Sequence, residues 1–180
     1  MKRKIIVTAI IVAALSIRFS AKSQTGLKHA RNNTDVLLIN QFDLTKTGVG
    51  LSKNTLLLGE QAFLKKFGKP LKATLEYSEE DEANMMHYRY KGADIWFLKN
   101  NLEAINITSA NYCFQMSNGS VIRVGNPIST VAHLFPSSWA NKALPEQVFV
   151  SLRNQSGPVD AHLIFEYDSN TNLIKGISVQ

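Results

Sequence analysis

Cysteine is almost absent from this sequence, and so are the short motifs that mark common catalytic and cofactor sites. The 180 residues include one cysteine, Cys113, so no disulfide can form within the chain. No P-loop, G-x-G-x-x-G, G-x-S-x-G or S-x-x-K pattern occurs, and these patterns carry phosphate, dinucleotide and acyl-transfer chemistry. We therefore expect a non-enzymatic protein without a cofactor, stabilised by its hydrophobic core.

Grouped metal ligands are also lacking. A zinc site needs three or four converging ligands, and no two histidines stand at H-x-H, H-x-x-H or H-x-x-x-H spacing. The four histidines are His29, His87, His133 and His162. The acidic run 79–82 lacks the alternating ligands and the glycine of a calcium loop. The sequence thus predicts no metal site, and a solvated acidic loop at 79–82.

The positive charge is concentrated in one segment. The chain has 20 Lys+Arg against 14 Asp+Glu, a formal charge of +6. Five of these basic residues and no acidic residue lie in the first 23 positions, so the remainder has 15 basic and 14 acidic residues and a charge of +1. A nearly neutral chain gives no electrostatic reason to bind nucleic acid or an anionic membrane surface.

Residues 1–23 have the order of a signal peptide. A basic start (2–4) precedes an almost unbroken apolar run of 13 residues from Ile5 to Ile17, and the small residues of Ala21-Lys22-Ser23 suit a signal peptidase. We expect cleavage between Ser23 and Gln24. A spanning helix needs about 20 apolar residues, so a retained membrane anchor is the weaker alternative.

The expected location follows from this segment. No cysteine follows the apolar run to accept the lipid of a bacterial lipoprotein. We therefore expect an exported protein of a Gram-negative bacterium, periplasmic or extracellular and not lipid-anchored, with no integral membrane segment after cleavage. Residues 24–34 are polar and are expected to form a flexible lead-in.

The rest of the chain contains an apparent internal repeat. Ala93-Asp94-Ile95-Trp96-Phe97 aligns with 161–165 at the same 68-residue offset that relates Phe67 to Phe135. Self-similarity at a fixed offset is typical of duplicated structural units. We therefore predict two tandem units, 35–108 and 109–180.

Each unit is predicted to begin with a short helix. In the first unit the helix spans 59–67, and Gly68 supplies a left-handed exit before Pro70. In the second unit Asn126 caps a helix that starts at Pro127 and stops at Pro136.

Strand-like segments follow both helices. Asn118-Gly119 is a strong hairpin signal, because both residues tolerate positive φ. An early strand, expected to be buried, is predicted at 36–39, with a turn at 47–50. The later predicted strands are 73–77, 86–90, 95–98, 102–108, 112–116, 121–124, 147–152, 160–167 and 173–179. The predicted fold is α+β, with two tandem units that each pack a short helix on an antiparallel sheet.

The turn Phe67-Gly68-Lys69-Pro70 between helix and sheet is the feature that suggests a known fold. The layout over residues 35–180 resembles the β-lactamase inhibitor protein fold and the related small outer-membrane-assembly lipoproteins, and also exported Gram-negative proteins of unknown function. This resemblance implies a helix-then-sheet arrangement. The chain departs from both families because it lacks the lipid-accepting cysteine and the paired cysteines of the inhibitors.

Aromatic side chains are the candidate binding residues. Alternation in the strand 86–90 places Tyr88 and Tyr90 on one face and His87 on the other. Trp96 lies on the next strand, and Trp139 follows the second helix. Tyr and Trp supply large contact areas at low entropic cost, so an open aromatic face would bind a partner. The alternative is that these aromatics form the core beneath the helix.

These observations lead to two hypotheses. The first is a secreted or periplasmic, non-enzymatic binding module whose partner is a protein or a cell-envelope component. The alternative is a cell-envelope hydrolase whose site forms only in three dimensions, from residues such as His87, Glu103 and His162.

Overall fold

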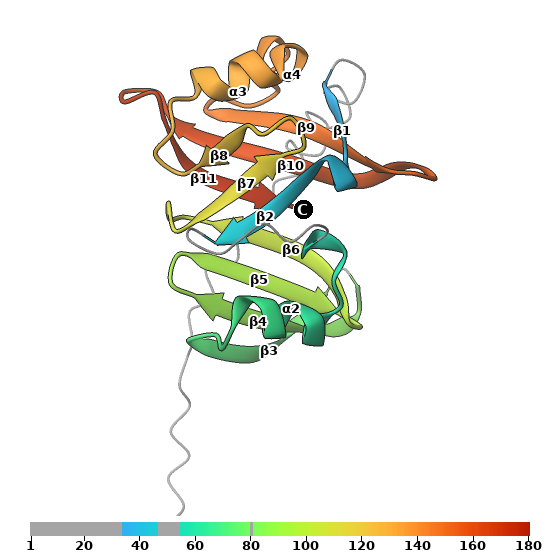
Figure 1. The fold of residues 1–180 in the computed structure, drawn as a ribbon. Coiled ribbons are helices and arrows are strands. Elements are labelled where there is room, and N and C mark those ends of the chain that lie inside the picture. The colour runs from blue at the N-terminus through green and yellow to red at the C-terminus, as the bar shows by residue number, and fades with distance from the viewer. Residues whose placement is uncertain (1–33, 47–54, 80) are drawn as a thin grey trace, which may run out of the picture.

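The computed structural model describes residues 34–46, 55–79 and 81–180, so the predicted signal peptide, the lead-in apart from Thr34, and the predicted turn at 47–50 lie outside the described residues. Strands dominate the described part of the chain (Figure 1). The elements in chain order are β1 (Val36–Leu38), the 3-10 helix η1 (Ile39–Gln41), β2 (Phe42–Lys46), the 3-10 helix η2 (Thr55–Leu57), α2 (Glu60–Phe67), β3 (Lys72–Ser78), β4 (Ala83–Tyr90), β5 (Ala93–Leu98), β6 (Asn101–Ile107), β7 (Tyr112–Met116), β8 (Val121–Arg123), α3 (Ser129–Leu134), α4 (Pro136–Ala140), β9 (Gln147–Asn154), β10 (Gly157–Asp168) and β11 (Leu173–Val179).

Eight strands form one large sheet, in the order β1-β9-β10-β11-β6-β5-β4-β3. All neighbouring strands in it are antiparallel except β1 and β9, which pair in parallel. The connection between its two halves is the β6–β11 pair, where Ile107 lies opposite Ile177 and Ile105 opposite Val179. Both isoleucines of the first pair are buried.

A second, three-stranded sheet has the order β2-β7-β8. It lies in front of the middle of the large sheet, with α2 on one side and α3 and α4 on the other (Figure 1). Its strand β7 alternates strictly, and its inward residues Tyr112, Phe114 and Met116 are buried.

The core lies between these layers. Helix α2 places Phe63 edge-on to Phe97 of β5 at 5.3 Å between ring centroids, and Phe67 at 6.4 Å from Tyr112 of the second sheet. Phe135, between α3 and α4, stacks on Phe165 of β10 at 5.9 Å. Buried residues of both sheets and of the helices form a single cluster, so one hydrophobic core stabilises the described fold.

The prediction of two tandem helix-on-sheet units is wrong. The strands assigned to the two units belong to one continuous eight-stranded sheet because β6 pairs with β11, and β7 and β8 leave it to form the second sheet with β2. The repeat in sequence reflects similar alternation of apolar residues in β5 and β10, which indicates strands but does not specify their neighbours. The structure is a mostly β architecture of two sheets with short helices.

Most individual elements were predicted correctly. The strands at 112–116 and 173–179 have the predicted bounds, and the other predicted strands after residue 72 lie within three residues of the observed ones. Gly68 ends α2 with a φ of 81°, and its N–H donates to the carbonyl of Leu64 at 2.8 Å, as the left-handed exit requires.

The second helix differs from the prediction. It begins at Ser129, and the Asn126 side chain instead accepts a hydrogen bond from the Arg123 N–H at 3.0 Å. The helix ends at Leu134, just before Pro136 as predicted, but Pro136 also begins a separate short helix, α4, because a proline fits the first helical turn, where its missing N–H would have no partner in the helix. The predicted strand at 36–39 exists as β1, but Val36 at this sheet edge is 57% exposed rather than buried.

None of the helices within 34–46, 55–79 and 81–180 has the length and apolar character needed to cross a membrane.

The β6–β11 pair predicts cooperative unfolding of the whole described fold. Ile177→Ala removes a side chain that is 1% exposed, which should lower the free energy of unfolding by about 2–5 kcal/mol. We expect one urea transition, shifted as a whole, by circular dichroism. The control Leu173→Ala, at a 40% exposed site, should change stability by less than about 0.5 kcal/mol. Two separate transitions would contradict the single core.

Candidate functional site

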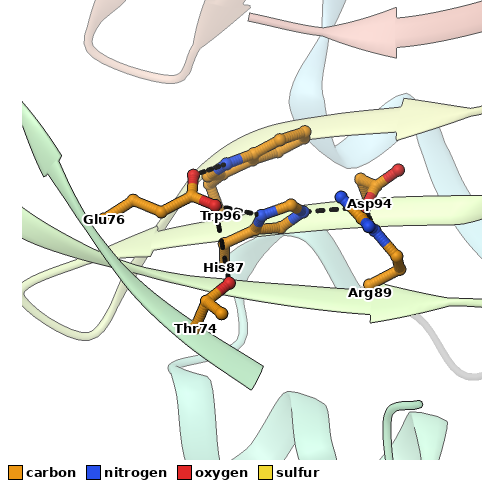
Figure 2. A network of polar contacts seen from close by, with 6 residues as sticks. All are labelled: Thr74, Glu76, His87, Arg89, Asp94 and Trp96. Carbon is orange, nitrogen blue, oxygen red and sulfur yellow. Dashed lines mark hydrogen bonds and ion pairs between the residues drawn. The ribbon is translucent and has the colours of Figure 1, made fainter. Parts of the chain in front are cut away.

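The outer end of the large sheet, formed by β3, β4 and β5, carries a polar cluster on the face opposite α2 (Figure 2). We call it the His87 cluster. Strand register places Thr74, His87 and Trp96 side by side across three strands, and side chains in such a row share one face of a sheet. The cluster consists of Thr74, Glu76, His87, Arg89, Asp94 and Trp96.

Both ring nitrogens of His87 contact carboxylates. Nδ1 lies 2.7 Å from Glu76 Oε1 and Nε2 lies 2.7 Å from Asp94 Oδ1. Arg89 Nε donates to the same Asp94 oxygen at 3.0 Å. Only a protonated imidazole donates from both nitrogens, so the arrangement has donors for both carboxylates when His87 is an imidazolium.

Trp96 is held flat against His87. The two rings stack with centroids 4.4 Å apart and planes 13° apart. The indole Nε1 donates to Glu76 Oε2 at 3.3 Å, so Glu76 reaches across β4 to fix both rings. The indole therefore has a fixed orientation on the sheet face, and an aromatic fixed in this way loses little entropy on binding.

Opposing effects act on the Glu76 carboxyl. Its partial burial favours a raised pKa, but the hydrogen bonds from His87 and Trp96, the charge of His87 and the hydroxyl of Thr74 outweigh it, so the pKa of Glu76 lies below its ordinary value of 4.5. The carboxylate form of Glu76 is therefore the one that the cluster stabilises.

The contacts of the His87 cluster suit a structural role, in which they stabilise the outer end of the sheet. The His87 side chain is buried, and each of its nitrogens is directed at a carboxylate, whereas a general base must reach the proton of a nucleophile. Buried polar groups that are fully paired rigidify their surroundings. The cluster thus stiffens the outer end of the sheet and fixes Trp96 on its surface.

Tyr88 and Tyr90 lie on the opposite face, beneath α2, and each is 6% exposed. The Tyr88 hydroxyl donates to Glu60 of α2 at 2.5 Å, and the Tyr90 hydroxyl donates to the Gly68 carbonyl at 3.0 Å. Burial, together with the Glu60 carboxylate, raises the pKa of Tyr88 to about 12, and burial with the nearby Tyr112 raises the pKa of Tyr90 to about 12. These two candidate residues anchor the helix rather than face a partner.

Trp139 lies at the far end of the molecule on α4. Its ring is 5.8 Å from that of Tyr167, and Lys142 Nζ sits 3.4 Å from its centroid. Burial lowers the pKa of Lys142. The four predicted binding residues are thus in three places: Trp96 on the open face, Tyr88 and Tyr90 in the core, and Trp139 under a lysine.

The residues of the alternative catalytic site are not brought together. His87 is on β4, Glu103 on β6 and His162 on β10, and β5, β6 and β11 separate β4 from β10. Four strand spacings amount to about 19 Å. His162 instead lines a cleft of ≈ 570 Å³ with residues of β1, β9 and β10.

Other candidate ligands are also dispersed. Cys113 Sγ lies 2.9 Å from the hydroxyl of Thr45, and His133 is exposed on α3. His29 lies outside the described residues. Within the described ranges, no three His, Cys, Asp or Glu side chains form a group that could hold a metal ion. The described residues of the acidic run 79–82 are exposed beyond the end of β3.

Sequence reasoning missed an apolar strip along the edge strand β3. Leu71 is 75% exposed, Leu75 64% and Tyr77 62%. We call these three residues the β3 strip. Leu75 and Tyr77 lie opposite Met86 and Asn84 of β4, on the face that bears α2. The sequence predicts a strand at 73–77, and only the sheet order shows that this strand is an edge.

Comparison with known proteins gives one remote likeness to report. No protein family and no curated protein matches the chain. Among solved structures, an extracellular protein containing a SCP domain, from Bacillus anthracis str. Ames, is similar over 76% of this chain with a TM-score of 0.37 and 8% identity. The chain spans 49% of the length of that protein. A likeness this weak carries no argument about function.

The lowered pKa of Glu76 predicts a pH-dependent contribution to stability. The contribution should be complete above pH 4.5, the ordinary pKa of the carboxyl, and should disappear as the pH falls through the lowered value. The difference in unfolding free energy between wild type and Glu76→Gln, from urea titrations, should therefore be largest near neutral pH and shrink in acid. Glu79→Gln, which removes an exposed carboxylate nearby, is the control. A difference that stays constant with pH would refute the assignment.

Proposed function

We propose that the protein is an exported, non-enzymatic binding module, that its partner is another protein or a cell-envelope component, and that the outer end of the large sheet is its binding surface. The observation that carries this proposal is the β3 strip. Large apolar side chains exposed singly are common on protein surfaces, but a group of them on an edge strand is typical of interaction sites.

Strand β3 contributes to both faces of this surface. Leu75 and Tyr77 project on the α2 side, while Thr74 and Glu76 project into the His87 cluster beside Trp96. The apolar strip lies on one face of this edge, and the rigid Trp96 with its polar neighbours lies on the other, so a partner that wraps around the edge would meet both an apolar centre and polar surroundings. Trp96 is accordingly the predicted binding residue that we retain.

The absence of enzymatic activity is supported by the His87 cluster. Its histidine is directed at two carboxylates, and the other residues considered for a hydrolase lie on separate strands of the sheet. The near-neutral charge that remains after residues 1–23 are removed supports a partner other than nucleic acid.

Export is supported by residues 1–23, whose basic start, apolar run and small residues fit a signal peptide. The proposed location is the periplasm or the outside of a Gram-negative cell, without a lipid anchor.

Cleavage after Ser23 can be measured directly. When the full chain is expressed in a Gram-negative host, the protein in the periplasmic fraction or the medium should have Gln24 as its first residue, as seen by intact-mass and peptide mass spectrometry. Ala21→Arg and Ser23→Arg should each leave the precursor uncleaved, because a signal peptidase needs small residues at these positions. A mature wild-type protein that retains residues 1–23 would contradict the assignment.

The binding surface can be tested by a matched pair of double variants. Immobilised residues 24–180 should capture a component from an envelope extract, and Leu75→Ser with Tyr77→Ser should reduce the captured amount about tenfold or more, because interface centres carry most of the binding energy. The control, Leu57→Ser with Leu173→Ser, removes two exposed apolar side chains elsewhere and should bind normally. No capture above background by folded wild type, or equal capture by both variants, would overturn the proposal.

A further inference from the structure

We propose that β3 pairs with β3 of a second copy of this chain in antiparallel orientation, centred on Thr74, so that the two large sheets become one. This inference rests on the proposed binding role of the outer end of the sheet and names the partner of that surface.

Strand β3 offers an edge to which another strand can be added. Within the part of the chain that the structure describes, β3 has one neighbour in the sheet, β4, and Figure 1 shows it as the last strand at its end of the sheet. Alternate backbone N–H and C=O groups of an edge strand point away from the sheet and are free to pair. The seven residues Lys72–Ser78 contain no proline or glycine, which would interrupt such pairing. Their exposed apolar side chains leave the edge attractive to another strand.

The charges of β3 are complementary to those of a second β3 in this register. Antiparallel pairing centred on Thr74 places each Lys72 directly opposite Glu76 of the second copy, and it does so twice because the pair is symmetric. Lys72 and Glu76 project on the same face of β3 as Thr74, so their side chains meet. Opposite charges that face each other across a strand pair stabilise it.

The apolar face of β3 also fits this pairing. The same register places Leu75 opposite Ala73 of the second copy, on the face that bears α2. If the pairing extends by one residue beyond the start of β3, Leu71 lies beside Tyr77 of the second copy. A leucine beside a small residue and a leucine beside an aromatic ring are favourable cross-strand neighbours. The whole β3 strip would thereby be covered.

The alternative register centred on Leu75 lacks the charged pairs. It places Lys72 opposite Ser78 and Glu76 opposite Thr74. An exposed ion pair contributes little affinity, but it discriminates between registers because the backbone hydrogen bonds are similar in both. The charges therefore select the register centred on Thr74, while backbone pairing and burial of Leu75 and Tyr77 provide the attraction.

The Glu76 carboxylate can serve both copies. It accepts hydrogen bonds from His87 and Trp96 of its own chain, yet its side chain remains 46% exposed, which leaves room for Lys72 of the second copy. A single strand pair is smaller than the interfaces of about 1,200–2,000 Å² that hold stable complexes. The dimer should therefore be concentration-dependent.

The primary experiment measures the mass of residues 24–180 in solution by sedimentation velocity over a wide concentration range. We expect wild type to shift from monomer to dimer with increasing concentration. Leu75→Lys should raise the dimer dissociation constant about tenfold or more, because a lysine protects an edge strand and is present twice in the contact. Leu173→Lys, at an exposed site on β11, is the matched control and should dimerise as wild type does.

The register is tested by oxidation of single-cysteine variants that carry Cys113→Ser. Thr74→Cys should form a disulfide-linked dimer, because side chains directly opposite each other have Cβ atoms about 4.5–5.5 Å apart. Leu75→Cys should crosslink much less, since position 75 faces position 73 of the second copy, and position 75 of that copy lies two residues further along the strand. Circular dichroism confirms that each variant is folded.

The outcomes separate this inference from the proposed function. Wild type that stays monomeric at every concentration overturns the dimer, and capture of an envelope component through the β3 strip by that monomer would assign the edge to a different protein. More efficient crosslinking of Leu75→Cys than of Thr74→Cys overturns the register. Dimerisation that Leu75→Lys does not weaken overturns the use of this edge.

Discussion

The pairing of β6 with β11 is the contact on which the rest of the architecture depends. It joins β3, β4, β5 and β6 to β11, β10, β9 and β1 in one sheet. Ile105 and Ile107 of β6, together with Ile177 of β11, are buried at this junction. The three-stranded sheet covers the junction and shares its core with the helices on either side (Figure 1). Without this pair, each half would have an additional unpaired edge and an uncovered apolar face.

The outer end of the sheet has its properties because it is remote from that junction. On the face that bears α2, Tyr88 of β4 is buried, whereas Leu75 and Tyr77 of the edge strand β3 remain exposed. The two faces are nevertheless connected through β4. Tyr88 bonds to α2 below the sheet, while the adjacent His87 bonds to Glu76 above it. The helix and the His87 cluster thus hold the same strand from opposite sides.

Local sequence patterns predicted the elements of this fold much better than their neighbours. The alternation at 112–116 and the apolar pattern at 173–179 are sufficient to define β7 and β11, because side-chain period is a local property. No local pattern specifies that Ile107 pairs with Ile177, and this pairing replaced two expected units with one sheet. Alternation likewise placed His87 and Tyr88 on opposite faces, but only the packing of α2 shows which face is covered. The part that Glu76 plays in the cluster could not be predicted, because its contacts depend on the order of β3, β4 and β5 in the sheet.

The order in which the strands pair has a consequence for how this chain must fold. Among the described strands, β1 pairs with β9 alone, and β2 pairs with β7, which in turn pairs with β8. The first strands of the described chain can therefore pair only after strands much later in the sequence have been synthesised. Such long-range pairing slows folding. Hairpins between neighbouring strands such as β3 and β4 can form early, but the core closes only when β9 and β11 are available to pair with β1 and β6.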